Sequence, residues 1–150
     1  RHMPSAHIIA TDISEAALDV ARRNAQQHGV ADRIDFLQGD LLEPIRSKRF
    51  HFLVSNPPYI SDAEWEQVAP NVKNHEPAHA LRAGPEGLDY IQPIIEQSPN
   101  LLASPGQLVL EIAASQKQTV LQLANDAGLE HPTVLPDHEK LPRILIANAP

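Results

Sequence analysis

An apolar run of the chain ends in an amide, two prolines and a tyrosine: Asn56-Pro57-Pro58-Tyr59. The prolines have a fixed φ and no backbone N–H, so the main chain after Asn56 is stiff and its carbonyls stay free to face a ligand. The Asn56 amide offers an acceptor and a donor group, and the Tyr59 ring can stack on a flat substrate. These groups can hold a planar nitrogen conjugated to a carbonyl or a ring. Such a nitrogen is a poor nucleophile, so its methylation requires orientation and hydrogen-bond polarisation.

Two acidic residues end other predicted strands. Asp12 precedes a predicted helix, where its carboxylate can accept hydrogen bonds from ribose hydroxyls or simply cap the helix. Asp40 lies in Gly39-Asp40-Leu41. Its carboxylate can accept the exocyclic amine of an adenine, with Leu41 covering the base, or the segment is an ordinary Gly-Asp turn. The residues alone leave both alternatives open.

The hydrophobic spacing predicts alternating strands and helices. The expected strands, the first and third of them buried, are 7–12, 33–38, 50–55, 107–112, 133–135 and 143–147. The expected helices are 13–28, 88–102 and 115–127. This alternation predicts an α/β fold with a mainly parallel sheet covered on both faces. Ligands of such sheets bind beyond the carboxyl ends of the strands, so the residues of interest are Asp12, Asp40, Asn56 and Glu111.

The region from Asn56 to about Gly87 is rich in proline and shows no clear periodicity, so we expect it to be irregular. A connection of this length is usually functional. It contains His75-Glu76-Pro77-Ala78-His79, which fits the H-E-x-x-H zinc pattern. That site needs both histidines on one face of a helix, and Pro77 would break or kink the helix. We therefore expect no metal site.

Composition limits the class of protein. The 150 residues are enough for one ordinary domain, with 42% hydrophobic residues and no cysteine. No apolar run approaches the ~20 residues that span a bilayer, and no signal peptide opens the sequence. We expect a cytoplasmic protein without membrane contact. The net charge is −7, and the nearest basic cluster is the short segment 46–49. This balance favours a protein or small-molecule partner, with nucleic acid involved only indirectly.

Several segments resemble the protein-glutamine N5-methyltransferases, and among these the enzymes acting on peptide chain release factors. The resemblance covers nearly the whole chain. It rests on the segments Ile9-Ala10-Thr11-Asp12-Ile13-Ser14, Ala21-Arg22-Arg23-Asn24-Ala25, Ser55-Asn56-Pro57-Pro58-Tyr59-Ile60, Glu76-Pro77, Ala80-Leu81, Gly84-Pro85-Glu86-Gly87-Leu88 and Leu110-Glu111-Ile112. It implies a Rossmann-like fold that uses S-adenosyl-L-methionine to methylate the glutamine of a Gly-Gly-Gln loop in a release factor or, within the same family, a glutamine of a ribosomal protein.

The resemblance also implies roles for individual residues. Asn56, Pro57 and Tyr59 would be the catalytic residues. The substrate would contact Asn56, Pro57, Pro58, Tyr59 and Glu76. The cofactor would contact Asp12, Ile13, Asp40, Leu41 and Asn56.

The sequence departs from this family at its start. The glycine-rich cofactor loop, the first strand and the N-terminal helical domain would all precede Arg1, so we expect residues 1–150 to form a partial catalytic domain. The first strand would lie between strands 7–12 and 50–55. Without it, strand edges and apolar area are exposed, and we expect self-association through these edges. Ala113 and Pro142-Arg143 are smaller departures, and Arg1-His2-Met3 is either natural sequence or a cloning remnant.

Two alternatives differ from protein-glutamine methylation. N6-adenine methyltransferases of DNA or RNA also use Asn-Pro-Pro-Tyr to hold a flipped base, but the acidic net charge and the lack of a basic groove oppose this substrate. A non-catalytic remnant or assembly module is the other alternative, because much of a cofactor site built on a glycine loop and a helix N-terminus is absent.

Overall fold

The computed structural model describes residues 5–150, and the Arg1-His2-Met3 segment lies outside the described residues. The chain divides into two compact units, Arg1–Arg46 and Ser47–Pro150. The strands form two sheets, one in each unit. The expectation that residues 1–150 make one partial catalytic domain stays a prediction.

The first unit is a βαβ motif with two parallel strands. Strand β1 (Ile8–Asp12) leads into helix α1 (Glu15–Gln27), and the short η1 turn (Ala31–Arg33) precedes strand β2 (Ile34–Gln38). The hydroxyl of Ser14 accepts the Ala17 N–H at 3.2 Å, and Oδ1 of Asp12 accepts the Ser14 N–H at 2.8 Å. Helix α1 therefore begins at a side-chain cap, which Asp12 supports from the strand end. The η2 turn (Glu43–Ile45) follows β2.

The second unit is built on a mixed sheet of four strands in the order β3-β4-β6-β5. Strand β3 (Phe50–Ser55) pairs in parallel with β4 (Leu102–Glu111), so both strands end at the same edge. Strands β5 (Glu130–Pro136) and β6 (Pro142–Asn148) form the predicted closing pair, and β6 runs antiparallel to β4. Strand β4 begins earlier than the expected residue 107.

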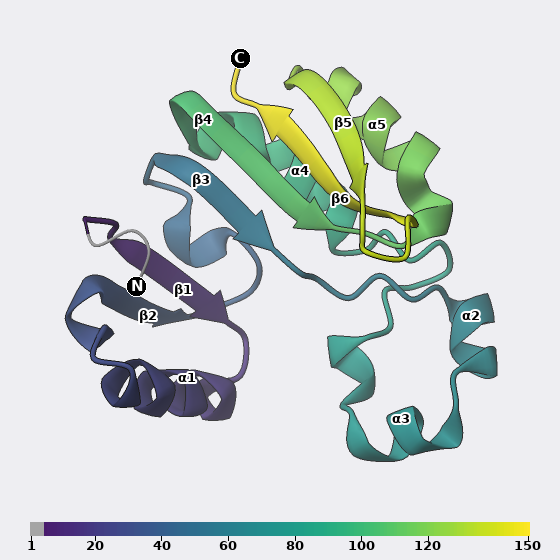
Figure 1. Cartoon of the computed structure of the whole chain (residues 1–150), viewed down its shortest axis with the longest axis horizontal. Helices are drawn as coiled ribbons and strands as arrows, with labels where there is room; N and C mark the ends of the chain where they lie inside the picture. Colours follow the sequence, from purple (N-terminus) through teal and green to yellow (C-terminus); the bar gives the residue numbers. More distant parts are fainter. Residues whose placement is uncertain (1–4) are drawn as a thin grey trace. The chain divides into compact units, whose positions relative to one another are not determined.

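Helices α4 (Ile91–Leu101) and α5 (Lys117–Asp126) contact each other and cover one face of this sheet (Figure 1). The η4 turn (Ala114–Gln116) leads into α5. Buried side chains alternate along the strands toward the helices, as in the register pairs Leu53 with Leu108 and Leu110 with Leu145. The core of the second unit therefore lies between this face and α4 and α5.

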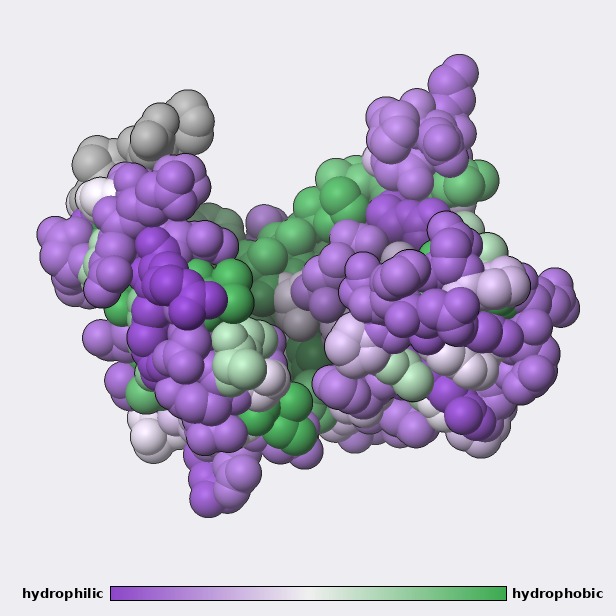
Figure 2. Space-filling view, turned by 90° about the horizontal axis from the view of Figure 1, so that it is seen from below, coloured by the Kyte–Doolittle hydropathy of each residue, from purple (hydrophilic) through white to green (hydrophobic). Residues whose placement is uncertain are grey.

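Two expectations about burial were wrong. Strand β3 is not buried on both faces: Phe52 and Val54, which flank Leu53, are 55% and 69% exposed. Strand β1 is also partly open, with Ile8 48% exposed. The reason is that, among the described residues, each sheet is covered by helices of its own unit on one face: α1 packs on β1 and β2, and α4 and α5 share one face of the four-stranded sheet. Figure 2 shows apolar side chains reaching the surface among hydrophilic ones. Self-association through strand edges stays a prediction.

The region 56–87 is more regular than expected. It contains helix α2 (Asp62–Gln67), helix α3 (Pro70–His75) and the η3 turn (Ala78–Ala80). Helix α2 begins at a capping box, in which Ser61 and Glu64 bond each other's backbone N–H. Apolar periodicity could not reveal these helices because none of their residues is buried. Within residues 5–150, no helix is long and apolar enough to cross a membrane.

Candidate functional site

The carboxyl ends of β1 and β2 bring together four of the five residues expected to contact a cofactor, and the fifth, Asn56, follows β3 in the second unit. The strands are in register, with Asp12 opposite Gln38, and the Gly39 N–H donates to the Asp12 carbonyl at 3.1 Å. Leu41 has a φ of 45°, and its carbonyl accepts the Thr11 hydroxyl at 3.4 Å. Asp12, Ile13, Asp40 and Leu41 therefore gather at one strand edge because parallel strands end on the same side.

The chemistry of this edge fits a nucleoside. The Ser14 N–H occupies Oδ1 of Asp12, while Oδ2 has no hydrogen-bond partner among the described residues. A free, exposed carboxylate oxygen at a strand end can accept a ribose hydroxyl. Asp40 is also exposed, and Leu41 next to it supplies an apolar side chain. The residues present fit the ribose and adenine part of S-adenosylmethionine.

In the second unit, the loop after β3 is fixed to the end of β4 through Tyr59. The Tyr59 hydroxyl donates to Oε1 of Glu111 at 3.3 Å. The Arg143 guanidinium carbon lies 6.0 Å from the centre of the Tyr59 ring. Arg143 is held by two further contacts, because it donates to the Ile112 carbonyl at 3.2 Å and to Asp137 at 3.3 Å. Residues far apart in the sequence thus orient one aromatic ring.

The electrostatics of this cluster favour the neutral phenol. Burial raises the pKa of Tyr59 above its ordinary value, and the negative charge of Glu111 raises it further, while Arg143 partly offsets both effects. Ionised Tyr59 would place a second negative charge beside the Glu111 carboxylate. Tyr59 therefore acts here as a hydrogen-bond donor and an aromatic surface, not as a base.

Asn56 and Pro57 stand next to this anchored tyrosine with free polar groups. Asn56 follows β3 directly and is exposed. Among the described residues, no hydrogen bond engages the Asn56 side-chain amide or the Pro57 carbonyl. The exposed Asn56 amide is open to a ligand, whereas Pro57 is buried, and both residues lie in a stiff, anchored loop. This arrangement can hold the two N–H groups of a planar amide.

Glu76 is not part of this cluster. It is exposed at the end of α3, and its N–H donates to the Val72 carbonyl at 2.9 Å. Helix α3 ends at His75 and η3 begins at Ala78, with Pro77 between them. His75 and His79 therefore belong to different helices, as the position of Pro77 predicts.

Sequence reasoning missed two residues that support Tyr59. Gln116 is 6% exposed, and its amide donates to the carbonyls of Tyr59 and Gly87. Arg143 was noted only as a departure from the family pattern. A glutamine in a predicted helix and an arginine at the start of a predicted strand give no signal of burial or of a distant partner. Glu111 was noted as a strand-end residue, although without a role.

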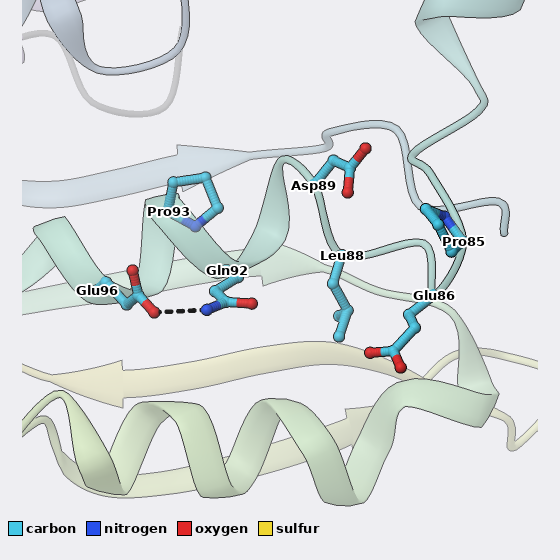
Figure 3. A pocket seen from close by; sticks show the side chains of 7 residues that line it. All are labelled: Pro85, Glu86, Leu88, Asp89, Gln92, Pro93 and Glu96. Atoms are coloured by element: carbon cyan, nitrogen blue, oxygen red, sulfur yellow. Dashed lines mark hydrogen bonds between the residues drawn. The ribbon is translucent and has the colours of Figure 1, made fainter.

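A shallow pocket of about 530 Å³ lies beside α4 (Figure 3). Its lining is Pro85, Glu86, Leu88, Asp89, Gln92, Pro93 and Glu96. Three of these side chains are carboxylates, and Gln92 donates to Glu96 at 2.7 Å. None of the lining residues is a strand-end residue, so this pocket is distinct from the Tyr59 cluster.

Comparison with known proteins decides the family. Residues 1–84, more than half of the chain, match the methyltransferase small domain. The chain belongs to this methyltransferase family. The matched range includes Asp12, Asp40 and the Asn56-Pro57-Pro58-Tyr59 segment, and Glu111 lies beyond it.

Curated relatives narrow the resemblance within the methyltransferase small domain family. Release factor glutamine methyltransferase of Moorella thermoacetica is 42% identical over 147 residues, which cover 97% of this chain and 52% of that protein. The enzyme of the same name from Cereibacter sphaeroides is also 42% identical, with 98% and 52% covered. The chain therefore spans about half the length of these relatives.

Solved structures agree on the fold. The catalytic domain of hMettl16, in complex with MAT2A 3'UTR hairpin 1, superposes with a TM-score of 0.71 at 15% identity, covering 96% of this chain and 58% of that one. A ribosomal protein L11 methylase from Lactobacillus delbrueckii gives a TM-score of 0.66 at 17% identity, with 96% and 58% covered. These likenesses show the Rossmann-like methyltransferase fold.

Proposed function

We propose that this chain carries the acceptor-amide site and the nucleoside-binding edge of an S-adenosylmethionine-dependent protein-glutamine N5-methyltransferase. The substrate class we propose is the Gly-Gly-Gln loop of peptide chain release factors. The observation that carries the proposal is the loop Asn56-Pro57-Pro58-Tyr59, which follows β3 with an exposed, unpartnered amide at Asn56 and an anchored ring at Tyr59. The names of the curated relatives support the substrate class.

Each residue of the loop makes a different contact with the glutamine amide. The Asn56 side-chain oxygen accepts one N–H of the glutamine amide and the Pro57 carbonyl accepts the other, while the Tyr59 ring covers its flat face. Two acceptors draw electron density toward the nitrogen and fix its orientation, which are the requirements for a weak nucleophile. Pro58 keeps the main chain stiff between these contacts.

Four of the five proposed cofactor contacts, all except Asn56, lie in the first unit. Oδ2 of Asp12 accepts a ribose hydroxyl, Asp40 lies near the adenine amine, and Ile13 and Leu41 cover the apolar part of the nucleoside. Bound S-adenosylmethionine supplies an electrophilic methyl group. The residues of this chain bind its nucleoside and orient the acceptor nitrogen, which takes the methyl group by direct displacement without a covalent enzyme intermediate. The C–N bond forms as the S–CH3 bond breaks, the thioether S-adenosylhomocysteine leaves, and the nitrogen loses one of its two N–H protons.

The test measures cofactor binding and methyl transfer separately. Calorimetric titration with S-adenosylhomocysteine checks the nucleoside edge, and Asp12→Ala should abolish the heat of binding. Transfer of a labelled methyl group to a release factor checks the acceptor site, with a Gly-Gly-Ala release factor as the matched control. Label on the control protein or on DNA would overturn the proposed substrate, and label on a ribosomal protein alone would replace the release factor. Binding of S-adenosylhomocysteine without any methyl transfer would indicate a non-catalytic remnant that binds the nucleoside.

A further inference from the structure

One buried glutamine of the second unit connects three separate segments of the chain. Gln116 ends the η4 turn and is 6% exposed. Among the described residues, it shares the class of buried polar side chains only with Ser98. A buried side-chain amide needs partners for its two N–H groups and its oxygen, because an unmade hydrogen bond in the interior is costly.

All of these partners are main-chain groups. Nε2 donates to the Gly87 carbonyl at 2.8 Å and to the Tyr59 carbonyl at 3.2 Å. Oε1 accepts the Ala113 N–H at 2.9 Å. One planar amide therefore joins the loop after β3, the turn before α4 and the turn after β4.

The chain at Gly87 is shaped around this amide. Gly87 has a φ of +72°, and a Cβ at this position would collide with the Tyr59 carbonyl oxygen. The same Cβ would lie only 2.8 Å from Nε2 of Gln116. Both the left-handed backbone and the close approach require glycine here.

These contacts hold Tyr59 at both ends, the carbonyl through Gln116 and the hydroxyl through Glu111. The two prolines before Tyr59 have a fixed φ, so holding Tyr59 in place also restricts the position of Asn56. We propose that Gln116 is a positioning residue that sets the main chain of Asn56-Pro57-Pro58-Tyr59 for the acceptor amide. This proposal rests on the proposed function for its catalytic meaning. Gln116 itself touches neither the substrate nor the cofactor.

The first measurement uses the unaltered 150-residue chain. By NMR, the Gln116 side-chain amide protons should exchange slowly with solvent and show a nuclear Overhauser effect to the Gly87 α-protons, because Nε2 is buried against that residue. Exchange as fast as that of a free amide, or the absence of this nuclear Overhauser effect, would overturn the proposed contacts of Gln116. This test needs no substitution.

The second measurement follows the Tyr59 ring signals in Gln116→Glu. At neutral pH a carboxylate would face the carbonyls of Tyr59 and Gly87, so the Tyr59 signals should move toward those of the unfolded chain. In acid the protonated side chain can again donate to one carbonyl and accept the Ala113 N–H, so the signals should return toward the unaltered position. Gln116→Met lacks these groups and should shift Tyr59 without any recovery in acid. Tyr90→Phe assigns the two tyrosine signals.

Ser98→Ala is the matched control. The Ser98 hydroxyl is buried and donates to the Ile95 carbonyl at 2.9 Å within α4. Its loss should lower the melting temperature and leave the Tyr59 signals in place. Equal movement of Tyr59 in Ser98→Ala, or unmoved Tyr59 signals in folded Gln116→Glu or Gln116→Met, would overturn the positioning role.

Methyl transfer then separates this inference from the proposed function. If the unaltered chain methylates a Gly-Gly-Gln protein, kcat in Gln116→Glu should fall about a hundredfold at neutral pH, as expected for a misplaced acceptor. The KM for S-adenosylmethionine should change by less than about twofold, because Gln116 does not touch the cofactor and its substitution leaves cofactor binding in place. If the unaltered chain transfers no methyl group, the proposed function fails for this chain. The Tyr59 measurements still decide whether Gln116 positions the loop.

Discussion

The Tyr59 hydroxyl donates to the Glu111 carboxylate at 3.3 Å, which connects the loop after β3 to the end of the neighbouring strand β4. The two strands are parallel, and Ser55 pairs with Leu110 at the last step of their register. The pair of residues therefore sits at the strand edge where ligands of α/β sheets bind. Its hydrogen bond orients an aromatic ring beside the exposed amide of Asn56.

The first prediction concerns the charge at Glu111. In Glu111→Gln, the amide oxygen can still accept the Tyr59 hydroxyl, but the negative charge that helps to raise the pKa of Tyr59 is gone. The pKa of Tyr59 should therefore fall in this variant. NMR titration of the tyrosine ring carbons measures it. An unchanged pKa would show that the two side chains do not interact in solution.

The second prediction has the opposite sign. Arg143 lowers the pKa of Tyr59 against the effects of burial and Glu111. In Arg143→Met, the pKa of Tyr59 should rise further, because methionine lacks the positive charge that stabilises ionised Tyr59 and keeps much of the packing. Arg143→Lys is the control, since it keeps a positive charge and should raise the pKa less. The same titration reads both variants, and a fall in the pKa would contradict the placement of the guanidinium.

Local patterns predicted much of this architecture, and distant contacts account for what was missed. The alternation of apolar runs and helical spacing located β1, α1, β2 and β3 to within a few residues. Gly29, directly after the expected helix 13–28, has a left-handed φ of +64°, which is typical of the end of a helix. These features depend on neighbouring residues, which a single sequence displays.

Tertiary contacts determined the rest. The partner of Tyr59 lies 52 positions away and the side chain that binds its carbonyl lies 57 away, so no local period reports them. The exposure of Phe52 and Val54 depends on which face α4 and α5 cover. Asp12 and Asp40 in the first unit, and Asn56 and Glu111 in the second, could be selected in advance because the parallel strands within each sheet end on the same side.

The third prediction tests the acceptor amide. Asn56→Ala removes the side-chain oxygen that accepts one N–H of the glutamine amide and leaves the main chain of the loop in place. Methyl transfer should fall by about 10² to 10³-fold, the effect expected from losing one oriented polar contact of a transition state. The melting temperature should hardly change, because Asn56 is exposed. Full activity in this variant would contradict the role of Asn56, and a large drop in melting temperature would assign it a structural one.

The fourth prediction concerns stability in acid. The Leu141 N–H donates to Asp137 at 3.0 Å and, with Arg143, lowers the pKa of this carboxyl. Because the pKa of Asp137 in the folded state is lower than its ordinary value of about 3.9, the carboxylate stabilises the fold at pH values above that ordinary value. This stabilisation is lost as the pH falls through the folded-state pKa. Asp137→Asn should therefore lose less stability than the unaltered chain between neutral pH and acid. Urea denaturation at several pH values measures this, and parallel curves for the two chains would count against it.

The fifth prediction compares two glycines with similar backbone and different surroundings. Gly87 and Gly128 have φ values of +72° and +81°. An alanine in this region costs about 1–2 kcal/mol from its backbone alone, and Gly128→Ala should show only this cost because nothing lies within 4 Å of its new Cβ. In Gly87→Ala the Cβ also meets the Tyr59 carbonyl and the Gln116 amide, so its free energy of unfolding should fall further. Urea unfolding of both variants measures the difference. Equal losses would mean that the loop can move away from Gly87, in which case Tyr59 is not held as closely as its contacts with Gln116 and Glu111 require.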